Sequence, residues 1–218
     1  MKTSLLRHVG FLFIYLFIVW GSYRLLIKLP DTIEEIIIKP LIWITPVIFL
    51  VKKEKLGLNT IGITFDNFFR SVYISLILGS VFVMVAVTLN YFKYGRLNFG
   101  ANLGNEGLFL SLGLSFATAI SEEITFRGYI FTRLWRALGD ESRYGEWQAN
   151  LITSLAWTAL HIPITIFVNK LDPLSAIIYL FLTFIFGIGS AFLYGRTKNI
   201  GSSIFLHVLW EWPIILFR

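Results

Sequence analysis

Long apolar stretches separated by short charged segments constrain this chain more than any other feature. A helix that crosses a lipid bilayer needs about 20 mostly apolar residues, and the 218-residue sequence holds about seven stretches that approach this length. They run over His8–Leu29, Ile36–Val51, Phe68–Phe92, Leu108–Leu134, Ala149–Val168, Leu174–Tyr194 and Ser202–Phe217. The second and the seventh are short, as is typical of tilted or re-entrant segments. The sequence therefore predicts an all-α, polytopic transmembrane bundle of about seven helices (six to eight).

Composition agrees with a bundle in lipid and leaves no room for a soluble domain. Hydrophobic residues make up 56% of the chain and charged residues 15%, which is far from the average of soluble domains. The polar stretches between the apolar ones are too short to form a separate core. We therefore predict one integral membrane domain over residues 1–218. The chain has no cysteine, so catalysis or metal binding must use His, carboxylate or hydroxyl side chains.

The net charge of +6 indicates contact with anionic lipid headgroups rather than with nucleic acid. The Lys and Arg residues flank the apolar stretches in short segments, where they anchor helices at the membrane surface. The N-terminus and the loops after the second, fourth and sixth stretches hold more of them than the other loops do. By the positive-inside rule, the N-terminus is cytoplasmic. The expected partners are membrane lipids, and no nucleic acid is expected.

Two adjacent acids lie inside the fourth apolar stretch, in the run SEEITFRG. A carboxylate at the membrane centre costs about 2.5–3.5 kcal/mol, so two of them need polar partners or a water-filled cavity. Glu123 and Arg127 are four residues apart, a spacing that favours an ion pair on one helical face. Glu122 points about 100° away and has no such partner in its own helix. We predict a supporting role for Glu123 with Arg127, and a carboxylate available for chemistry at Glu122. The alternative is that the run marks the cytoplasmic end of the helix, with Arg127 reaching the headgroups.

Two histidines and a third acid occupy the apolar stretches that follow. His161 comes shortly before Pro163, which lacks an amide donor and predicts a kink or a helix end. His207 and Glu211 are about one turn apart in the last stretch. Each of these residues, taken alone, is consistent with a packing role. Three helices that each carry an unexpected polar group are most simply explained by convergence on one cavity, between the helices in the second half of the chain.

Small residues at four-residue spacing mark a helix contact in the sixth stretch. Gly187, Ala191 and Gly195 share one helical face. Small residues in membrane helices let a neighbouring backbone approach closely. We therefore predict that this face packs against another helix.

The polar residues of the second half together resemble the CPBP family of intramembrane proteases, which includes the type II CAAX prenyl endopeptidases and the bacterial Abi proteins. Three family motifs appear in the family's order and in predicted membrane helices. EExxxR is matched by Glu122, Glu123 and Arg127, FxxxH by Trp157 and His161, and HxxxN by His207 and Glu211. The resemblance covers roughly residues 108–213, which we predict to be the catalytic core.

The resemblance implies a mechanism for these side chains. In relatives, the first Glu of EExxxR and the His of FxxxH activate a water molecule that attacks a peptide carbonyl, without metal, cofactor or covalent intermediate. In this chain those residues are Glu122 and His161, and a carboxylate can serve as a general base near pH 7. The residues of the third motif form the oxyanion hole in relatives, a role that falls here to His207 and Glu211.

Glu211 departs from the family pattern, because relatives carry Asn at the end of the third motif. An Asn amide donates hydrogen bonds, whereas an ionised Glu only accepts them and repels an oxyanion. Glu211 therefore fits the oxyanion hole only when it is protonated. Otherwise it orients His207, or the activity is altered or lost.

The leading functional interpretation is an intramembrane endopeptidase in a bacterial plasma membrane. Its expected substrate is a membrane-associated or lipidated, CAAX-like peptide or protein. One alternative is a non-proteolytic bacteriocin-immunity or membrane-binding protein on the same fold, because family members are linked to bacteriocin immunity. Another is a metal site built from His and Glu ligands, although the chain has no H-E-x-x-H motif. The expected site contains neither a metal nor a cofactor.

Overall fold

The computed structural model describes residues 2–99, 107–139 and 142–217, and the other positions of the predicted 1–218 domain lie outside the described residues. The described residues form helices and no strand. The longer helices are α1 (Lys2–Leu26), α3 (Lys39–Lys53), α4 (Phe68–Tyr94), α5 (Leu108–Glu123), α6 (Thr132–Gly139), α7 (Arg143–Pro163), α8 (Pro173–Thr197) and α9 (Gly201–Phe217). The short segments are α2 (Asp31–Ile33), the 3₁₀ turn η2 (Leu58–Ile61), and the π-helical η1 (Glu34–Ile38), η4 (Ile124–Phe131) and η5 (Ile164–Val168). The predicted all-α fold class is confirmed.

Five helical stretches are long and apolar enough to cross a membrane. They are Lys2–Leu26, Phe68–Tyr94, Leu108–Gly139, Arg143–Val168 and Pro173–Thr197. These correspond to the first and to the third through sixth predicted stretches. The second and seventh stretches form α3 and α9, of 15 and 17 residues, and are not among these five. The chain is therefore an integral membrane protein with several spanning helices, as predicted.

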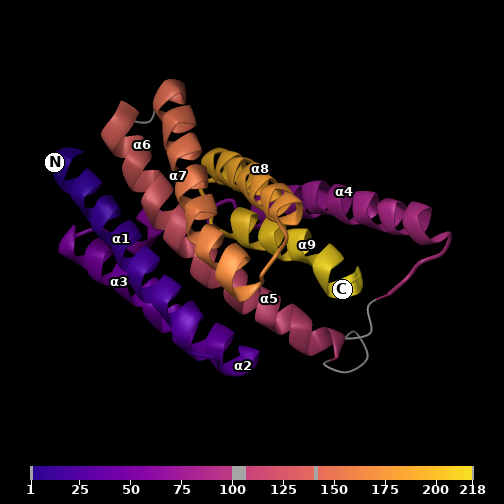
Figure 1. Ribbon diagram of the computed structural model, residues 1–218. Helices are drawn as coiled ribbons and strands as arrows, with labels where there is room; N and C mark the ends of the chain where they lie inside the picture. The colour runs from indigo at the N-terminus through magenta and orange to yellow at the C-terminus, as the bar shows by residue number, and fades with distance from the viewer. Residues whose placement is uncertain (1, 100–106, 140–141, 218) are drawn as a thin grey trace.

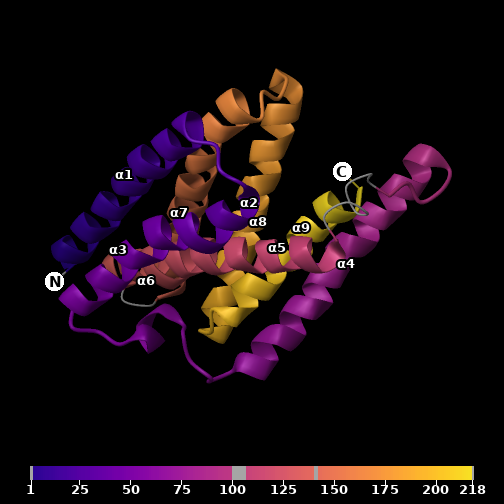
Figure 2. The same cartoon turned by 90° about the horizontal axis from the view of Figure 1, so that it is seen from below.

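One long helix, formed by α5, η4 and α6, runs through the middle of the molecule (Figure 1). On one side it contacts α1 and α3, and on another it contacts α7 (Figure 2). Helix α9 packs against α5, α8 and α4, and α4 extends away from the rest of the bundle with most of its apolar surface exposed. Residues 121–131 are buried without exception. The acids of the fourth stretch therefore lie inside the bundle and not at a helix end.

The small-residue face of α8 packs against α7. A side-chain carbon added at Gly187 would lie 3.0 Å from the Cβ of Ser154, and one at Gly195 would collide with the carboxylate of Glu146. Ala191, between them, is fully buried. The predicted helix contact is confirmed, and it places α8 beside the helix that carries His161.

The three π-helical segments adjoin residues that carry polar chemistry. Segment η1 ends directly before Lys39, and η4 begins directly after Glu123. At Pro163 the α-helical part of α7 passes directly into η5, so the helix changes its geometry there instead of ending. A wider turn after Pro163 accommodates the missing amide donor. π-Helical turns inside α-helices are frequent at functional sites.

Glu54, at the end of α3, connects three other parts of the bundle. Its carboxylate accepts hydrogen bonds from Tyr129 Oη (2.6 Å) and Arg133 Nε (2.7 Å) and lies 2.9 Å from His8 Nδ1. Burial alone would raise the pKa of Glu54, but the hydrogen bonds and the charge of Arg133 outweigh burial and hold the pKa below its ordinary value. The ionised carboxylate links α1, η4 and α6 at one end of the molecule.

Candidate active site

A cavity of about 310 Å³ lies between α1, α3, α5, α7, α8 and α9. This volume is at the lower end of the range for small-molecule and cofactor sites. The titratable residues that line it are Arg24, Glu35, Lys39, Glu122, His161, Tyr179, His207 and Glu211. Helices of the second half provide most of the wall, as predicted, and α1, η1 and α3 of the first half close it.

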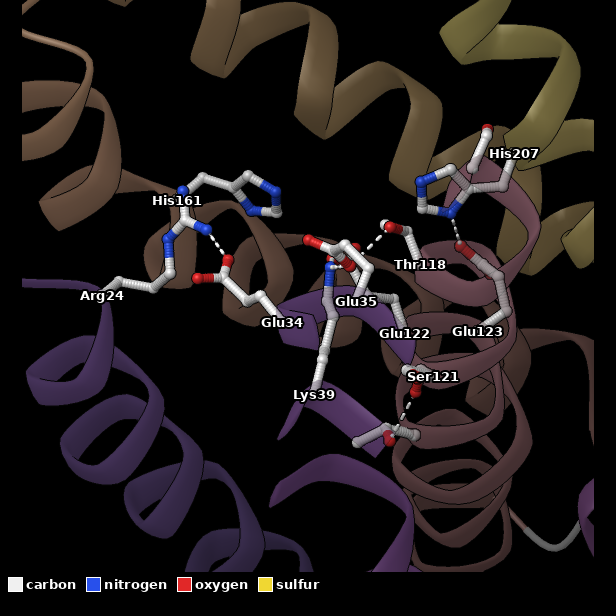
Figure 3. Close-up of polar contacts among 12 residues, drawn as sticks. Arg24, Glu34, Glu35, Lys39, Thr118, Ser121, Glu122, Glu123, His161 and His207 are labelled. Carbon is white, nitrogen blue, oxygen red and sulfur yellow. Dashed lines mark hydrogen bonds and ion pairs between the residues drawn. The ribbon is translucent and has the colours of Figure 1, made fainter. Parts of the chain in front are cut away.

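Glu122, on α5, faces this cavity and is paired with a lysine from a distant part of the chain. Its Oε1 lies 2.6 Å from the Nζ of Lys39, and only 9% of the Glu122 side chain is exposed. Figure 3 shows Lys39 reaching from α3 to the two carboxylates beside it. Glu122 has no ion-pair partner in its own helix, as expected, and the lysine that pairs with it was not predicted from the sequence. Tertiary packing of α3 on α5 supplies the cation.

Lys39 belongs to a polar network that sequence reasoning missed. Its Nζ donates to Glu35 Oε2 at 2.9 Å, and the hydroxyl of Thr118 donates to the same oxygen at 2.6 Å. Arg24 forms a separate ion pair with Glu34 (Figure 3). The available signal was the four-residue spacing of Glu35 and Lys39, which puts a lysine inside an apolar stretch.

Glu123, next to Glu122, has a different environment. Its side chain is fully buried, and its Oε1 lies 3.2 Å from Arg127 and 2.7 Å from His207 Nδ1. Ser190 Oγ donates to Oε2 at 2.9 Å. The Arg127 guanidinium also lies over the Trp157 ring, 4.2 Å from its centroid, where a cation–π contact compensates part of its desolvation. The predicted Glu123–Arg127 ion pair is present.

His161 has one ring nitrogen engaged and the other directed to the cavity. Its Nδ1 lies 2.9 Å from the backbone carbonyl of Trp157. A carbonyl oxygen only accepts hydrogen bonds, so Nδ1 carries the hydrogen and the neutral ring keeps a lone pair on Nε2. The ring also packs on Trp157, with centroids 5.1 Å apart. Trp157 occupies the position of the Phe in the second motif, and it fixes both the orientation and the tautomer of His161.

His207 lies between two carboxylates. Its Nδ1 contacts Glu123, and its Nε2 lies 3.4 Å from Glu211 Oε1. The other oxygen of Glu211 accepts a short hydrogen bond from Ser115, and 26% of the Glu211 side chain is exposed. Of the alternatives for Glu211, this geometry favours orientation of His207. Within residues 2–99, 107–139 and 142–217, no three His, Asp or Glu side chains gather as metal ligands.

Comparison with models of protein families matches residues 104–213 to "Type II CAAX prenyl endopeptidase Rce1-like". This match spans half of the chain. The chain belongs to this family. Membership in the Rce1-like family confirms the resemblance inferred from the three motifs, and it identifies a family of proteases. No curated protein and no solved structure matches the chain.

The family match contains all six of the predicted site residues, and the structure brings them together. Glu122, His161, His207 and Glu211 line one cavity, and Glu123 with Arg127 lies directly behind it. Lys39 and Glu35 are outside the Rce1-like region. The first half of this family member therefore completes a cavity whose other polar groups come from the second half.

Proposed function

We propose that this protein is an intramembrane endopeptidase that hydrolyses peptide bonds in a membrane-associated or lipidated, CAAX-like substrate. The observation that carries the proposal is the shared cavity of Glu122 and His161, with a lone pair of His161 directed into it. The family supports peptide hydrolysis and a prenylated C-terminal sequence as the substrate class. The apolar helices support a substrate that is itself held at the membrane.

In the proposed reaction, Glu122 is the general base and His161 orients the water. The water oxygen bonds to the peptide carbonyl carbon, its proton passes to Glu122, and the carbonyl electron pair moves to the oxygen. The amide nitrogen then takes the proton from Glu122 as the C–N bond breaks. A positioned general base typically contributes about 10²–10⁴-fold to the rate.

His207 is the proposed donor to the developing oxyanion, and the groups around it hold its ring in place. Glu123 accepts from Nδ1 and is itself held by Arg127 and Ser190. Glu211 Oε1 lies 3.4 Å from the other ring nitrogen, a long contact that helps to position the ring and leaves the Nε2–H for the oxyanion. All the residues of this proposed mechanism lie within residues 108–213, which we propose as the catalytic core.

We propose that hydrolysis does not require a metal ion. The ammonium of Lys39 is 2.6 Å from the Glu122 carboxylate and would repel a divalent cation at that position. Cleavage should therefore be unchanged by a chelator. Loss of cleavage with a chelator, followed by recovery on addition of zinc, would contradict this part of the proposal.

We propose a bacterial plasma membrane location with a cytoplasmic N-terminus, and the distribution of Lys and Arg supports this orientation. A reporter that is active only in the cytoplasm, fused before Lys2, tests the orientation. Activity of the reporter is the expected result. An inactive N-terminal fusion, together with an active fusion in a loop on the opposite side, would reverse it.

The function is tested with purified protein in liposomes and a fluorescence-quenched peptide that ends in a farnesylated CAAX sequence. Mass spectrometry should detect the released tripeptide with the wild type and not with Glu122→Gln. In parallel, new N-termini are profiled in membranes of cells that produce either form. If neither assay shows a cleavage that depends on Glu122, the protease proposal is wrong, and a non-proteolytic binding or immunity role replaces it.

A further inference from the structure

Lys39 is a buried cation on the wall of the cavity, outside the region that the family match covers. Only 4% of its side chain is exposed. Its ammonium has three N–H donors, and two of them are engaged by Glu122 at 2.6 Å and by Glu35 at 2.9 Å. The third N–H of Lys39 is engaged by neither carboxylate, and the ammonium that carries it lies within hydrogen-bonding distance of Glu122, the proposed general base.

The position of Lys39 is fixed before any substrate binds. Glu35 holds the ammonium from the same helical stretch, and Thr118 of α5 holds Glu35. The ring centroids of Trp20 and Trp43 lie 5.5 and 5.8 Å from the Nζ of Lys39. Donors that are fixed in advance in a site with little water stabilise developing charge without a cost for reorganisation.

At the position where the family motif has Asn, this chain has Glu211, so the cavity lacks the amide donor that the Asn side chain would provide. Glu211 stands there, and its oxygens face Ser115 and His207. An ionised carboxylate cannot donate to an oxyanion. A cationic donor elsewhere on the same wall would supply the missing stabilisation.

We propose that Lys39 is a further catalytic residue, whose ammonium donates to the carbonyl oxygen of the scissile peptide as that oxygen becomes an oxyanion. This inference rests on the proposed hydrolysis by Glu122. During the attack, the water proton neutralises Glu122 while negative charge appears on the carbonyl oxygen. Negative charge thus moves from one neighbour of Lys39 to another, and the ammonium remains opposite a negative group throughout. When the C–N bond breaks, the electron pair returns to the carbonyl and Glu122 loses its proton to the amide nitrogen.

The simplest test is Lys39→Met, assayed with the farnesylated CAAX peptide in liposomes. We expect kcat to fall about 10²–10³-fold, the usual effect of removing one oxyanion donor, with little change in KM. Arg133→Met is the matched control, because Arg133 is also a buried cation paired with an acid, Glu54, but does not line the cavity. Its kcat should stay close to that of the wild type.

Because Lys39→Met leaves the buried Glu122 and the partly exposed Glu35 without their cation, a second experiment separates donation from charge. The chain has no cysteine, so Lys39→Cys introduces a single thiol. Alkylation with 2-bromoethylamine restores an ammonium with N–H donors. Alkylation with (2-bromoethyl)trimethylammonium restores the charge without a donor. Mass spectrometry verifies each product, and thermal unfolding verifies that each is folded.

The proposal expects the aminoethylated form to regain cleavage and the trimethylated form to remain impaired. Equal recovery in both forms would show that Lys39 is only a counter-ion, and failure of the aminoethylated form to exceed the unmodified variant would also overturn the proposal. Wild-type kcat in Lys39→Met, with cleavage lost in Glu122→Gln, would refute the role of Lys39 alone. Absence of cleavage by the wild type would refute the proposed function itself.

Discussion

The two adjacent carboxylates of α5 occupy contrasting surroundings. The Glu122 side lines a cavity, and its cation, Lys39, comes from the first half of the chain and is shared with Glu35. The Glu123 side is fully enclosed, and its partners Arg127, Ser190 and His207 all come from the second half. A rotation of about 100° between successive helical residues therefore separates a site for chemistry from the scaffold behind it.

The contrast shows how a membrane protein keeps several charges in its interior. Arg127 is fully buried and depends on one ion-paired acid and on two aromatic rings, so its environment tolerates little change. Glu122 shares its cation with a second acid, so either acid can change while the lysine keeps one partner. Removing one member of a buried pair is costly when the other is left without compensation.

The largest expected effect is on catalysis at Glu122. Glu122→Gln should lower kcat by about 10²–10⁴-fold, because the isosteric amide cannot accept the water proton. Its stability should change little, since Lys39 retains Glu35. Cleavage of the farnesylated peptide and thermal unfolding in detergent measure the two quantities. A folded Glu122→Gln protein with near-normal kcat would contradict the assignment of catalysis to Glu122 and of a structural role to Glu123.

The second effect is on stability at Glu123. Glu123→Gln leaves the buried guanidinium of Arg127 without an anion, and we expect a loss of about 3–5 kcal/mol in the free energy of unfolding. Denaturant titration in mixed micelles measures this loss, with Glu122→Gln as the matched control. Equal destabilisation by the two variants would show that the two acids do not differ as proposed.

Glu211 should give an intermediate effect on activity. Glu211→Ala removes the positioning contact to His207 and should lower kcat about 10- to 100-fold, in line with the loss of one hydrogen bond to a charged group. Glu211→Asn should retain or increase cleavage, because it restores the donor that the family motif carries. A fully active Glu211→Ala would remove this residue from the mechanism.

The smallest effects are expected at two serines that donate hydrogen bonds to the acids, Ser190 to Glu123 and Ser115 to Glu211. Ser190→Ala removes a donor to buried Glu123 and should cost about 1 kcal/mol of stability. Ser115→Ala removes the donor to the partly exposed Glu211 and should affect kcat more than stability. Parallel unfolding and cleavage measurements compare them. The reverse pattern would contradict the assignment of scaffold and cavity sides.

Local sequence signals were sufficient for the helices, for the Glu123–Arg127 pair and for the small-residue contact of α8. Each depends on hydrophobicity or on spacing within one helix. The same signals located Glu122, His161, His207 and Glu211, because an ionisable residue in an apolar stretch needs an explanation wherever its helix packs.

The missed features depend on distances along the chain that no local pattern encodes. Lys39 meets Glu122 only because α3 packs beside α5, and Thr118 meets Glu35 for the same reason. The π-helical segments arise from small changes in turn geometry rather than from composition. The role of Trp157 as a platform for Arg127 and as the acceptor for His161 likewise required the fold.

Direct attack by activated water is tested most directly by one turnover in water labelled with ¹⁸O, with enzyme in excess over the farnesylated peptide. We expect one ¹⁸O atom in the new carboxylate of the product and none in the side chain of Glu122. An unlabelled product together with ¹⁸O in Glu122 would mean that the carboxylate attacks the peptide itself, and would contradict the role of Glu122 as a general base.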